Sequence, residues 1–503
     1  PGGPRVIYQK VTPALVDELL RDVVAGGRVR ADLALFVWGA QDFEGVPALE
    51  TSDFWRGQER RLMRRFGQID PENIDHYLAT GGYEAFYKAL TAMQPEEITT
   101  LLKDAGLTGK GGANFPAGVK WDFLRTAAVK PKYVICNADE GDAGAWVNRE
   151  ILEGDPHLLI EGMAIGSYVM GAEFGYVYIR NEYPLAIARV EKAIRDAEDR
   201  GILGDDCLGT GVKCRLQVYH GHGSYLCGEE TALMESIEGR RGMPRIKPPF
   251  PAQAGVFGKP SNINNVETYA NAPDIVLNGK DWYRSLGSEK APGTKMFSLS
   301  GSIERTCVVE VPYGVPLTLL IDQMAGGVPA GHTFKALQPG GPLGGVVDAE
   351  TARGLTIEPP PFQEAGVLLG SGGFIVLDER TCMIDISRYF SAFCARESCT
   401  RCTTCRIGGM YSVDVLKRIQ HGGGKPADIA YLGELEESMR LDSYCVHGKN
   451  SPIAIATTLR YFKQEYEEHI YQHHCRAGVC SFASIGLIQI QPMTPPPERM
   501  GAG

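Results

Sequence analysis

The segment YVICNADEGDAG, residues 133–144, decides the fold class of this chain. Its first four residues are aromatic or apolar, which is typical of a buried β-strand. Asn137, Asp139 and Glu140 follow the strand directly, together with two glycines. In open α/β sheets, ligands bind beyond the carboxyl ends of the strands. The segment therefore predicts an α/β sheet with polar ligand-binding groups at the end of one strand.

Helix and strand patterns alternate on both sides of this strand. We expect strands at 175–179 and 216–219, and helices at 96–105, 157–170, 184–200 and 229–238. Alternation of this kind is typical of an α/β domain with a mainly parallel sheet.

Loops rich in glycine or asparagine flank the predicted sheet. GLTGKGGANFPAG, residues 106–118, contains five glycines, and such loops let backbone N–H groups approach a phosphate or a flat ring. The loop matches neither a P-loop nor a dinucleotide fingerprint, so by itself it could be purely structural. Residues 221–231 add a second glycine turn that leads into a helix, and residues 262–268 add an asparagine-rich run. With residues 137–144, these loops predict a nucleotide-type cofactor site.

Cys399, Cys402 and Cys405 form the strongest metal-binding signal in the chain. Three thiolates at a spacing of three residues can occupy three corners of a cubane cluster. Cys445 is the candidate fourth ligand, because it lies far enough along the chain to come from another helix end. The alternative is structural zinc, which usually uses two separated pairs of cysteines. The spacing favours a [4Fe–4S] cluster.

The remaining regions show other patterns. Strands at 296–300 and 307–311 and a helix at 317–324 predict a small β-grasp domain, and the helical period from 384 to 471 predicts a bundle. Residues 6–8 predict a strand, and a helix with Thr12 as its N-cap is expected through Val24. Residues 54–66 predict an amphipathic surface helix, and the tail after 484 is expected to be extended. The expected divisions are 1–35, 36–95 (a helical linker), 96–290, 291–378, 379–470 and 471–503 (a cysteine-containing tail).

Composition excludes several classes of protein. The 503 residues suggest about three domains. The 51 basic and 61 acidic residues give a net charge of −10, which argues against a nucleic-acid binder. Thirteen cysteines form a poor disulfide framework and are better explained as reduced thiols and metal ligands. The longest uncharged stretch, 477–497, contains four prolines and is no membrane helix, and no signal peptide is recognisable. We expect a soluble, cytoplasmic protein without direct membrane insertion.

Five segments together resemble the flavin- and NADH-binding subunit of respiratory complex I and its soluble relatives. Those relatives are the diaphorase subunits of NAD-reducing hydrogenases and of NAD-dependent molybdenum or tungsten formate dehydrogenases. The resemblance covers residues 80–465. It implies a Rossmann-like FMN/NAD domain, a small β-grasp domain and a C-terminal helical bundle that carries the iron–sulfur cluster. The matching segments are 106–121, 133–144, 223–239, 247–268 and 397–406.

The resemblance also implies cofactor contacts, residue by residue. The carboxylate of Glu230 near the adenosine ribose would repel a 2′-phosphate and favour NAD over NADP. Core packing is the alternative for each phenylalanine. The residues implied for FMN are Gly109, Lys110, Gly111, Lys120, Asn137, Asp139, Glu140, Gly228, Glu229, Asn264, Asn265 and Thr268. Those implied for NAD(H) are Phe115, Phe123, Asp142, Tyr225, Glu230, Lys247 and Phe250.

Some positions differ from the complex I pattern. Complex I forms have Arg at the position of Lys110, Gly at Asn114 and Glu at Asp142, and the form of residues 137–142 is closer to the soluble diaphorases. Residues 1–30 resemble the last strand and helix of a thioredoxin-like domain fused upstream in those relatives. No ferredoxin-like domain follows the bundle, which counts against a bifurcating hydrogenase.

These features favour the diaphorase subunit of a formate dehydrogenase. Its expected partners are a small [2Fe–2S] thioredoxin-like subunit and a large catalytic subunit with iron–sulfur clusters. A hydrogenase diaphorase and the complex I subunit are alternatives within the family. Two alternatives from other classes are a non-catalytic iron–sulfur scaffold and a phosphate-binding module without redox chemistry, which would leave the cysteines unexplained.

The sequence HIYQHHCRAGVC, residues 469–480, predicts a second metal site. His469, Cys475 and Cys480 offer three zinc ligands, and Cys382 is a candidate fourth. His473 and His474 compete for the histidine position. The alternative is a redox-active or idle pair of thiols.

Overall fold

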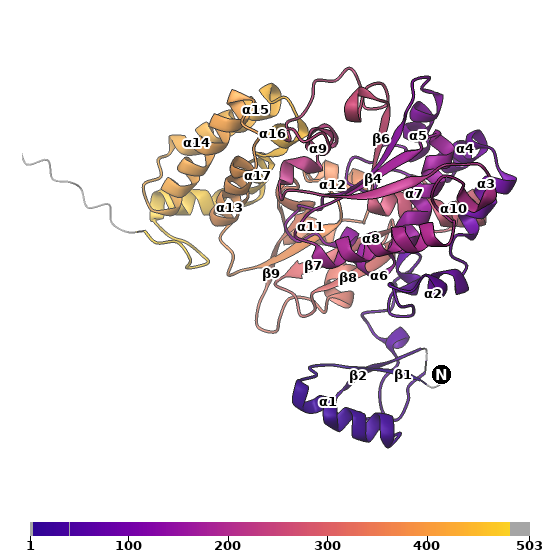
Figure 1. Cartoon of the computed structure of the whole chain (residues 1–503). Helices are drawn as coiled ribbons and strands as arrows, with labels where there is room; N and C mark the ends of the chain where they lie inside the picture. The colour runs from indigo at the N-terminus through magenta and orange to yellow at the C-terminus, as the bar shows by residue number, and fades with distance from the viewer. Residues whose placement is uncertain (1–3, 40, 483–503) are drawn as a thin grey trace, which may run out of the picture.

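A four-stranded parallel sheet contains the strand predicted at the start of the segment 133–144. The computed structural model describes residues 4–39 and 41–482 (Figure 1). The sheet has the order β5-β4-β3-β6, and every neighbouring pair is parallel. The α/β prediction is confirmed. The strands are β3 (Tyr133–Ala138), β4 (Phe174–Ile179), β5 (Arg215–His220) and β6 (Ser261–Asn265).

Helices pack around this sheet and close its core. The most buried is α7, whose residues face neighbours on all sides because it packs against α10, α8 and α5. Helix α10 begins directly after β6, a strand that the sequence did not predict because asparagine is rare in strands. The helices are α4 (Pro95–Ala105), α5 (Ala117–Thr126), α6 (Val147–Gly154), α7 (Pro156–Met170), α8 (Pro184–Asp199), α9 (Glu230–Ile237) and α10 (Val266–Arg284).

The second sheet has five strands in the order β10-β9-β11-β7-β8. Its first and last strands along the chain, β7 and β11, are parallel neighbours, and the other pairs are antiparallel. This arrangement is that of a β-grasp domain, as predicted. Its strands are β7 (Thr294–Gly301), β8 (Cys307–Pro312), β9 (Phe334–Pro339), β10 (Val347–Asp348) and β11 (Gly373–Asp378), with short helices α11 (Ala349–Arg353) and α12 (Pro359–Glu364).

The C-terminal helices form a bundle at one end of the molecule (Figure 1). The cysteine-rich loop joins α13 to α14, and the π-helix Glu468–Gln472 extends α17. None of the helices in 4–39 and 41–482 is long and apolar enough to cross a membrane. The expected extended tail lies outside the described residues. The bundle helices are α13 (Met383–Arg396), α14 (Thr403–Gln420), α15 (Ala427–Asp442), α16 (Val446–Asn450) and α17 (Ile453–Glu467).

The N-terminal residues form a small separate lobe (Figure 1). Antiparallel strands β1 (Arg5–Tyr8) and β2 (Ala34–Trp38) flank α1 (Pro13–Leu19) and the π-helix Leu20–Ala25. Thr12 precedes α1, but its side chain makes no capping hydrogen bond. Two further helices, α2 (Ile74–Ala79) and α3 (Glu84–Ala92), lead into the main domain.

The amphipathic helix predicted over residues 54–66 is wrong. This segment, all of which the structure describes, contains only a 3-10 turn, Leu62–Arg65. The Arg64 guanidinium lies 2.6 Å from the Asp274 carboxylate, and Arg65 lies 3.1 Å from Asp155. The arginines therefore bind an irregular segment to the core through ion pairs. Their spacing in the sequence is the same as that of the polar face of a surface helix, which is why the prediction failed.

Candidate cofactor and metal sites

Asn137 and Asp139 lie where β3 ends. Asn137 Nδ2 donates to the carbonyl oxygen of Gly228 at 2.8 Å, and Asn137 Oδ1 accepts from the backbone N–H of Asp139 at 3.1 Å. Asp139 Oδ2 is buried and has no hydrogen-bond partner among the described residues. Burial raises the pKa of Asp139 to about 7. A buried acceptor without a partner fits a ligand that carries hydroxyl groups, as the ribityl chain of FMN does.

The Glu140 carboxylate forms hydrogen bonds with the protein backbone. Its two oxygens accept from the backbone N–H groups of Asn148 and Arg149 at 3.0 and 3.1 Å, at the start of α6. Burial raises its pKa to about 7, although these donors work against the rise. The flavin contact of Glu140 stays a prediction.

The glycine loop packs closely against two other segments. A Cβ atom on Gly111 would lie 3.2 Å from Cβ of Asn265, and Gly112 has a φ of +106° next to the backbone of Gly370. The backbone N–H of Lys110 donates to Thr268 Oγ1 at 2.9 Å. The loop is thus fixed at the start of α10, which follows β6, the neighbour of β3 in the sheet.

The Lys110 ammonium points away from the loop. Its Nζ lies 4.5 Å from the centre of the Tyr313 ring and donates to the Thr294 carbonyl at 3.3 Å. Burial lowers its pKa to about 7. Lys110 therefore offers its backbone to the loop and its side chain to the second sheet.

The asparagines of β6 have partners on two sides. Asn264 Oδ1 accepts from the Trp121 indole N–H at 3.0 Å, and Asn265 Oδ1 accepts from the backbone N–H of Glu267 at 2.9 Å, which caps α10. Their amide nitrogens remain the groups that could donate to a flavin.

Glu230 lies between two lysines at the start of α9. Its oxygens are 2.9 Å from Lys120 Nζ and 2.6 Å from Lys247 Nζ. Burial would raise the pKa of Glu230, but the two positive charges outweigh it and lower the pKa to about 2. Glu229 caps the helix through the N–H groups of Thr231 and Ala232. A permanently ionised Glu230 is therefore held in a fixed position.

Phe115, Phe123 and Phe250 are not core residues. Their exposed fractions are 46%, 55% and 55%. The ring centres of Phe115 and Phe123 are 6.4 Å apart. Exposed aromatic faces this close together are suited to stacking against a flat ligand.

Asp142 and Tyr225 link the parallel-sheet domain to the C-terminal bundle. The Tyr225 hydroxyl donates to Asp142 Oδ1 at 2.7 Å, and Ser371 Oγ donates to Asp142 Oδ2 at 2.8 Å. The backbone N–H of Tyr225 donates to Glu397 in the cysteine loop at 3.0 Å. Since both Asp142 oxygens have protein partners, its predicted contact with NAD stays a prediction. The link joins the carboxyl end of β3, which we call the cofactor edge, to the bundle.

The four cysteines of the first metal motif lie at or next to helix N-termini. Cys402 and Cys445 are the N-cap residues of α14 and α16, Cys405 lies in the first turn of α14, and Cys399 precedes it. Helix N-termini stabilise thiolates. Burial raises the pKa of Cys405, and the charges of the other three cysteines raise it further while a Ser398 hydrogen bond opposes them. Gly448, which follows Cys445 in α16, packs against Cys405, because a Cβ atom on Gly448 would lie 3.1 Å from Cβ of Cys405. Cys445 therefore lies beside the cysteine loop, as the fourth ligand of one cluster must.

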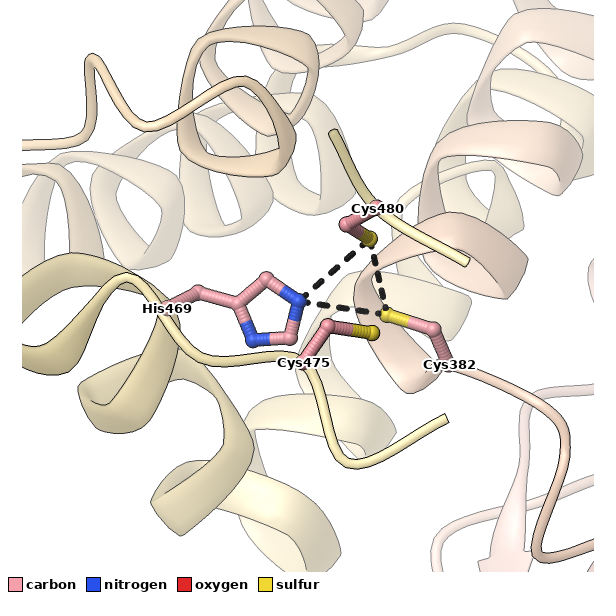
Figure 2. Close-up of side chains that lie close together, drawn as sticks. All are labelled: Cys382, His469, Cys475 and Cys480. Atoms are coloured by element: carbon pink, nitrogen blue, oxygen red, sulfur yellow. Dashed lines mark hydrogen bonds between the residues drawn. The ribbon is translucent and has the colours of Figure 1, made fainter. Parts of the chain in front are cut away.

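The second metal motif closes into a compact group, which Figure 2 shows. His469 Nε2 lies 3.5 Å from Cys382 Sγ and 3.4 Å from Cys480 Sγ, and the two sulfurs are 3.6 Å apart. With Cys475, all four ligand atoms lie within 4.8 Å of one another. His469 Nδ1 contacts the Glu465 carbonyl at 2.7 Å, which turns Nε2 toward the sulfurs. His473 instead stacks on Phe482 and does not join the group.

A polar sheet edge, tethered to a loop and helix ends that carry four cysteines, is typical of the class of iron–sulfur flavoprotein oxidoreductases. Residues 102–274 match the family described as the Nuo51 FMN-binding domain. Residues 385–469 match the NADH-ubiquinone oxidoreductase-F iron-sulfur binding region. The chain belongs to this family, that of the F subunits of NADH-quinone oxidoreductase, and its predicted cofactors FMN and a [4Fe–4S] cluster are confirmed.

Relatives support this membership over most of the chain. The chain is 45% identical to the HndC subunit of the NADP-reducing hydrogenase of Solidesulfovibrio fructosivorans, over 84% of this chain and 86% of the relative. It is 42% identical to the F 2 subunit of NADH-quinone oxidoreductase from Rhizobium meliloti (strain 1021), over 82% and 98%. It is also 40% identical to the corresponding F subunit from Escherichia coli (strain K12), over 80% and 91%.

A solved structure agrees with the sequence relatives. A chain of NAD+-reducing [NiFe]-hydrogenase in the H2-reduced state has a TM-score of 0.72 and 30% identity, covering 93% of this chain and 75% of that one. The resemblance predicted from the motifs is thus confirmed at the level of the family. The preference for formate dehydrogenase over hydrogenase or complex I is not confirmed.

Proposed function

We propose that this chain is the diaphorase subunit of an NAD-dependent formate dehydrogenase, which exchanges hydride between NAD(H) and FMN and passes single electrons through a [4Fe–4S] cluster to or from partner subunits. The observation that carries the diaphorase part is the link through Tyr225, which binds the cofactor edge through Asp142 and the cysteine loop through Glu397. Electron transfer between two cofactors requires such fixed proximity.

FMN would lie at the carboxyl end of β3. The unpartnered Asp139 oxygen would accept from a ribityl hydroxyl, and the glycine loop would let the flat ring approach backbone N–H groups. Bound FMN supplies the ability to exchange electrons in pairs or singly. The residues of the chain bind and orient the two rings and exclude water; hydride transfer between stacked rings needs no side-chain acid or base.

NAD(H) would stack beside the flavin against the exposed phenylalanines. Glu230, ionised between Lys120 and Lys247, would accept from the adenosine ribose hydroxyls and repel a 2′-phosphate. Glu229 also lies 3.5 Å from Lys247 Nζ, so two carboxylates face the two lysines and the group has no excess positive charge for a 2′-phosphate. This balance supports NAD rather than NADP as the substrate.

Cys399, Cys402, Cys405 and Cys445 would hold the [4Fe–4S] cluster. The cysteine loop lies against the segment before Lys247, because Arg401 donates to the Pro244 carbonyl at 2.9 Å and Arg241 donates to the Cys399 carbonyl at 3.2 Å. This contact supports a cluster next to the nucleotide site.

The partner subunits decide the overall reaction. The proposed partners in the cytoplasm are a small [2Fe–2S] subunit and a large molybdenum or tungsten formate dehydrogenase subunit. Co-purification followed by metal analysis tests this. Molybdenum or tungsten supports the proposal, nickel supports the hydrogenase alternative, and a membrane-bound preparation supports complex I.

The alternative from a different class, an iron–sulfur scaffold that does not catalyse, predicts no flavin. Flavin absorbance together with NADH–ferricyanide activity in the purified chain would contradict that alternative. Absence of both would contradict the diaphorase proposal.

We further propose that Cys382, His469, Cys475 and Cys480 bind a structural zinc ion. Three sulfurs and one imidazole nitrogen lie within 4.8 Å of one another, which is the ligand number and type of a structural zinc site, and the Glu465 carbonyl fixes the histidine ring. The group joins the start of α13 to the segment after α17, so zinc would fasten that segment to the bundle. Purified protein with iron but less than about half an equivalent of zinc would contradict this proposal and support idle thiols.

A further inference from the structure

Ser398 contacts a sulfur atom of the proposed cluster site. Its Oγ lies 3.3 Å from Cys405 Sγ, within the range of a hydrogen bond to sulfur. The residue is 9% exposed, and Cys405 is 7% exposed, the lowest value among the four cysteines. Water therefore competes little for this contact.

The direction of the bond follows from the state of the sulfur. Ser398 Oγ accepts from the backbone N–H of Thr400 at 3.1 Å, a contact that leaves its hydroxyl hydrogen available. A cysteine bound to iron has lost its own hydrogen and can only accept. In the loaded protein the serine must be the donor.

We propose that the Ser398 hydroxyl donates a hydrogen bond to the Cys405 sulfur and thereby raises the reduction potential of the cluster. A hydrogen bond withdraws electron density from a ligand sulfur, so it stabilises the reduced cluster, which carries one more negative charge. Ser398 is a positioning and tuning residue rather than a catalytic one. The inference rests on the proposed ligation by Cys399, Cys402, Cys405 and Cys445.

Two neighbouring groups show why Ser398 is the residue to change. The backbone N–H of Tyr444 donates to Cys402 Sγ at 3.3 Å, but a side-chain substitution does not remove a backbone donor. Thr404 offers a matched control, because its hydroxyl lies in the same region and contacts Ser443 Oγ at 3.4 Å instead of a sulfur.

The experiment measures the midpoint potential of the cluster in the full, FMN-loaded chain by redox titration followed with EPR. Ser398→Ala should lower the potential by an amount equal to about a tenfold change in the reduction equilibrium, or about 59 mV for one electron. Ser398→Thr keeps the hydroxyl and Thr404→Val leaves the sulfur contact intact, so both should stay near the wild-type potential. An unmoved potential in Ser398→Ala, or an equal fall in Thr404→Val, overturns the proposal.

A wrong cluster assignment would give a different result from a wrong role for Ser398. A wild-type chain without the EPR signal overturns the ligation and this inference with it, whereas a signal with an unmoved potential overturns only the role of Ser398. If Ser398→Ala assembles no cluster, the wild-type protein is placed briefly in D2O and studied by pulsed EPR. A coupled deuteron that is present in wild type and in Ser398→Thr supports the hydroxyl donor, because hydroxyls exchange faster than buried amides. Its absence from both overturns the proposal.

Discussion

The bundle contains two sulfur-rich sites that are built differently. The first, Cys399, Cys402, Cys405 and Cys445, comes from helix N-termini on the side that touches the cofactor domain. The second, Cys382, His469, Cys475 and Cys480, joins the start of α13 to the segment after α17. In the second, ligand atoms contact one another at 3.4–3.6 Å. In the first, the sulfurs of Cys402 and Cys405 are contacted by Tyr444 and Ser398, which are not ligands.

The contrast indicates two kinds of metal chemistry. Ligands that already touch suit a single ion, which needs a small closed shell. Sulfurs approached by outside donors suit a larger cluster whose potential is set by its surroundings. The tethers from the first site to Tyr225 and Pro244 hold it against the cofactor domain, where an electron carrier would have to lie. Position and closure therefore support the proposed electron carrier at the first site and the proposed structural zinc at the second.

Exchanging one sulfur in each site should separate the two roles most strongly. Cys402→Ser should abolish the [4Fe–4S] EPR signal and slow electron transfer between the flavin and the partner subunits by about a hundredfold or more, since the cluster is the proposed path between them. NADH–ferricyanide activity, which depends on the flavin, should persist. Cys480→Ser serves as the control and should keep the signal. Loss of the EPR signal only in Cys480→Ser would reverse the assignment.

The sequence suggested both proposed ligand sets, for different physical reasons. The spacing of three residues is local, so Cys399, Cys402 and Cys405 are recognisable without a fold. Cys382 is 87 residues from His469, and only the chemistry of the set suggested it. The parallel sheet followed from apolar strands such as 133–136.

Other features depended on tertiary contacts and could not be predicted. Strand β6 is asparagine-rich, which propensity places in loops. Lys110 turns its ammonium to Tyr313, and Asp142 gives both oxygens to protein donors. The 54–66 segment has a helical pattern but binds the core through arginines. Each of these outcomes depends on partners far away in the sequence.

Removing the proposed zinc ion should lower the thermal stability of the protein and leave electron transfer unchanged. Cys480→Ser should lower the zinc content to well under half an equivalent and lower the melting temperature by more than about 4 °C, because binding energy of a structural metal is folding energy. Zinc analysis and thermal unfolding measure this. The conservative control Cys307→Ser changes a cysteine outside both sites. Equal zinc in Cys480→Ser and wild type would show that the group holds idle thiols.

Glu230 is the proposed determinant of the choice between NADH and NADPH. Glu230→Gln should relax the preference for NADH over NADPH by about tenfold in kcat/KM, because the repulsion of a 2′-phosphate is lost. In the wild type, the pKa of Glu230 is lowered to about 2, so its charge is present at every pH well above that value. Discrimination should therefore be flat between about pH 7 and 9, where the 2′-phosphate, with a second pKa of about 6, is also fully ionised. A preference that survives the substitution would place recognition of the ribose elsewhere.

The smallest expected effect tests the tether that distinguishes the two sites. Glu397→Ala removes the acceptor for the Tyr225 backbone N–H while leaving all eight proposed ligand residues in place. Iron, zinc and flavin contents should stay unchanged, but stopped-flow reduction of the cluster by NADH should slow several-fold, because the loop loses one fixed contact with the cofactor edge. Glu436→Ala, which removes an exposed ion pair on α15, is the control. Equal rates in both variants would mean that the remaining contacts, from Arg401 and Arg241, hold the loop by themselves. In that case Arg401 and Arg241 would be the contacts that hold the loop, and a variant with both arginines replaced by alanine should slow the reduction of the cluster.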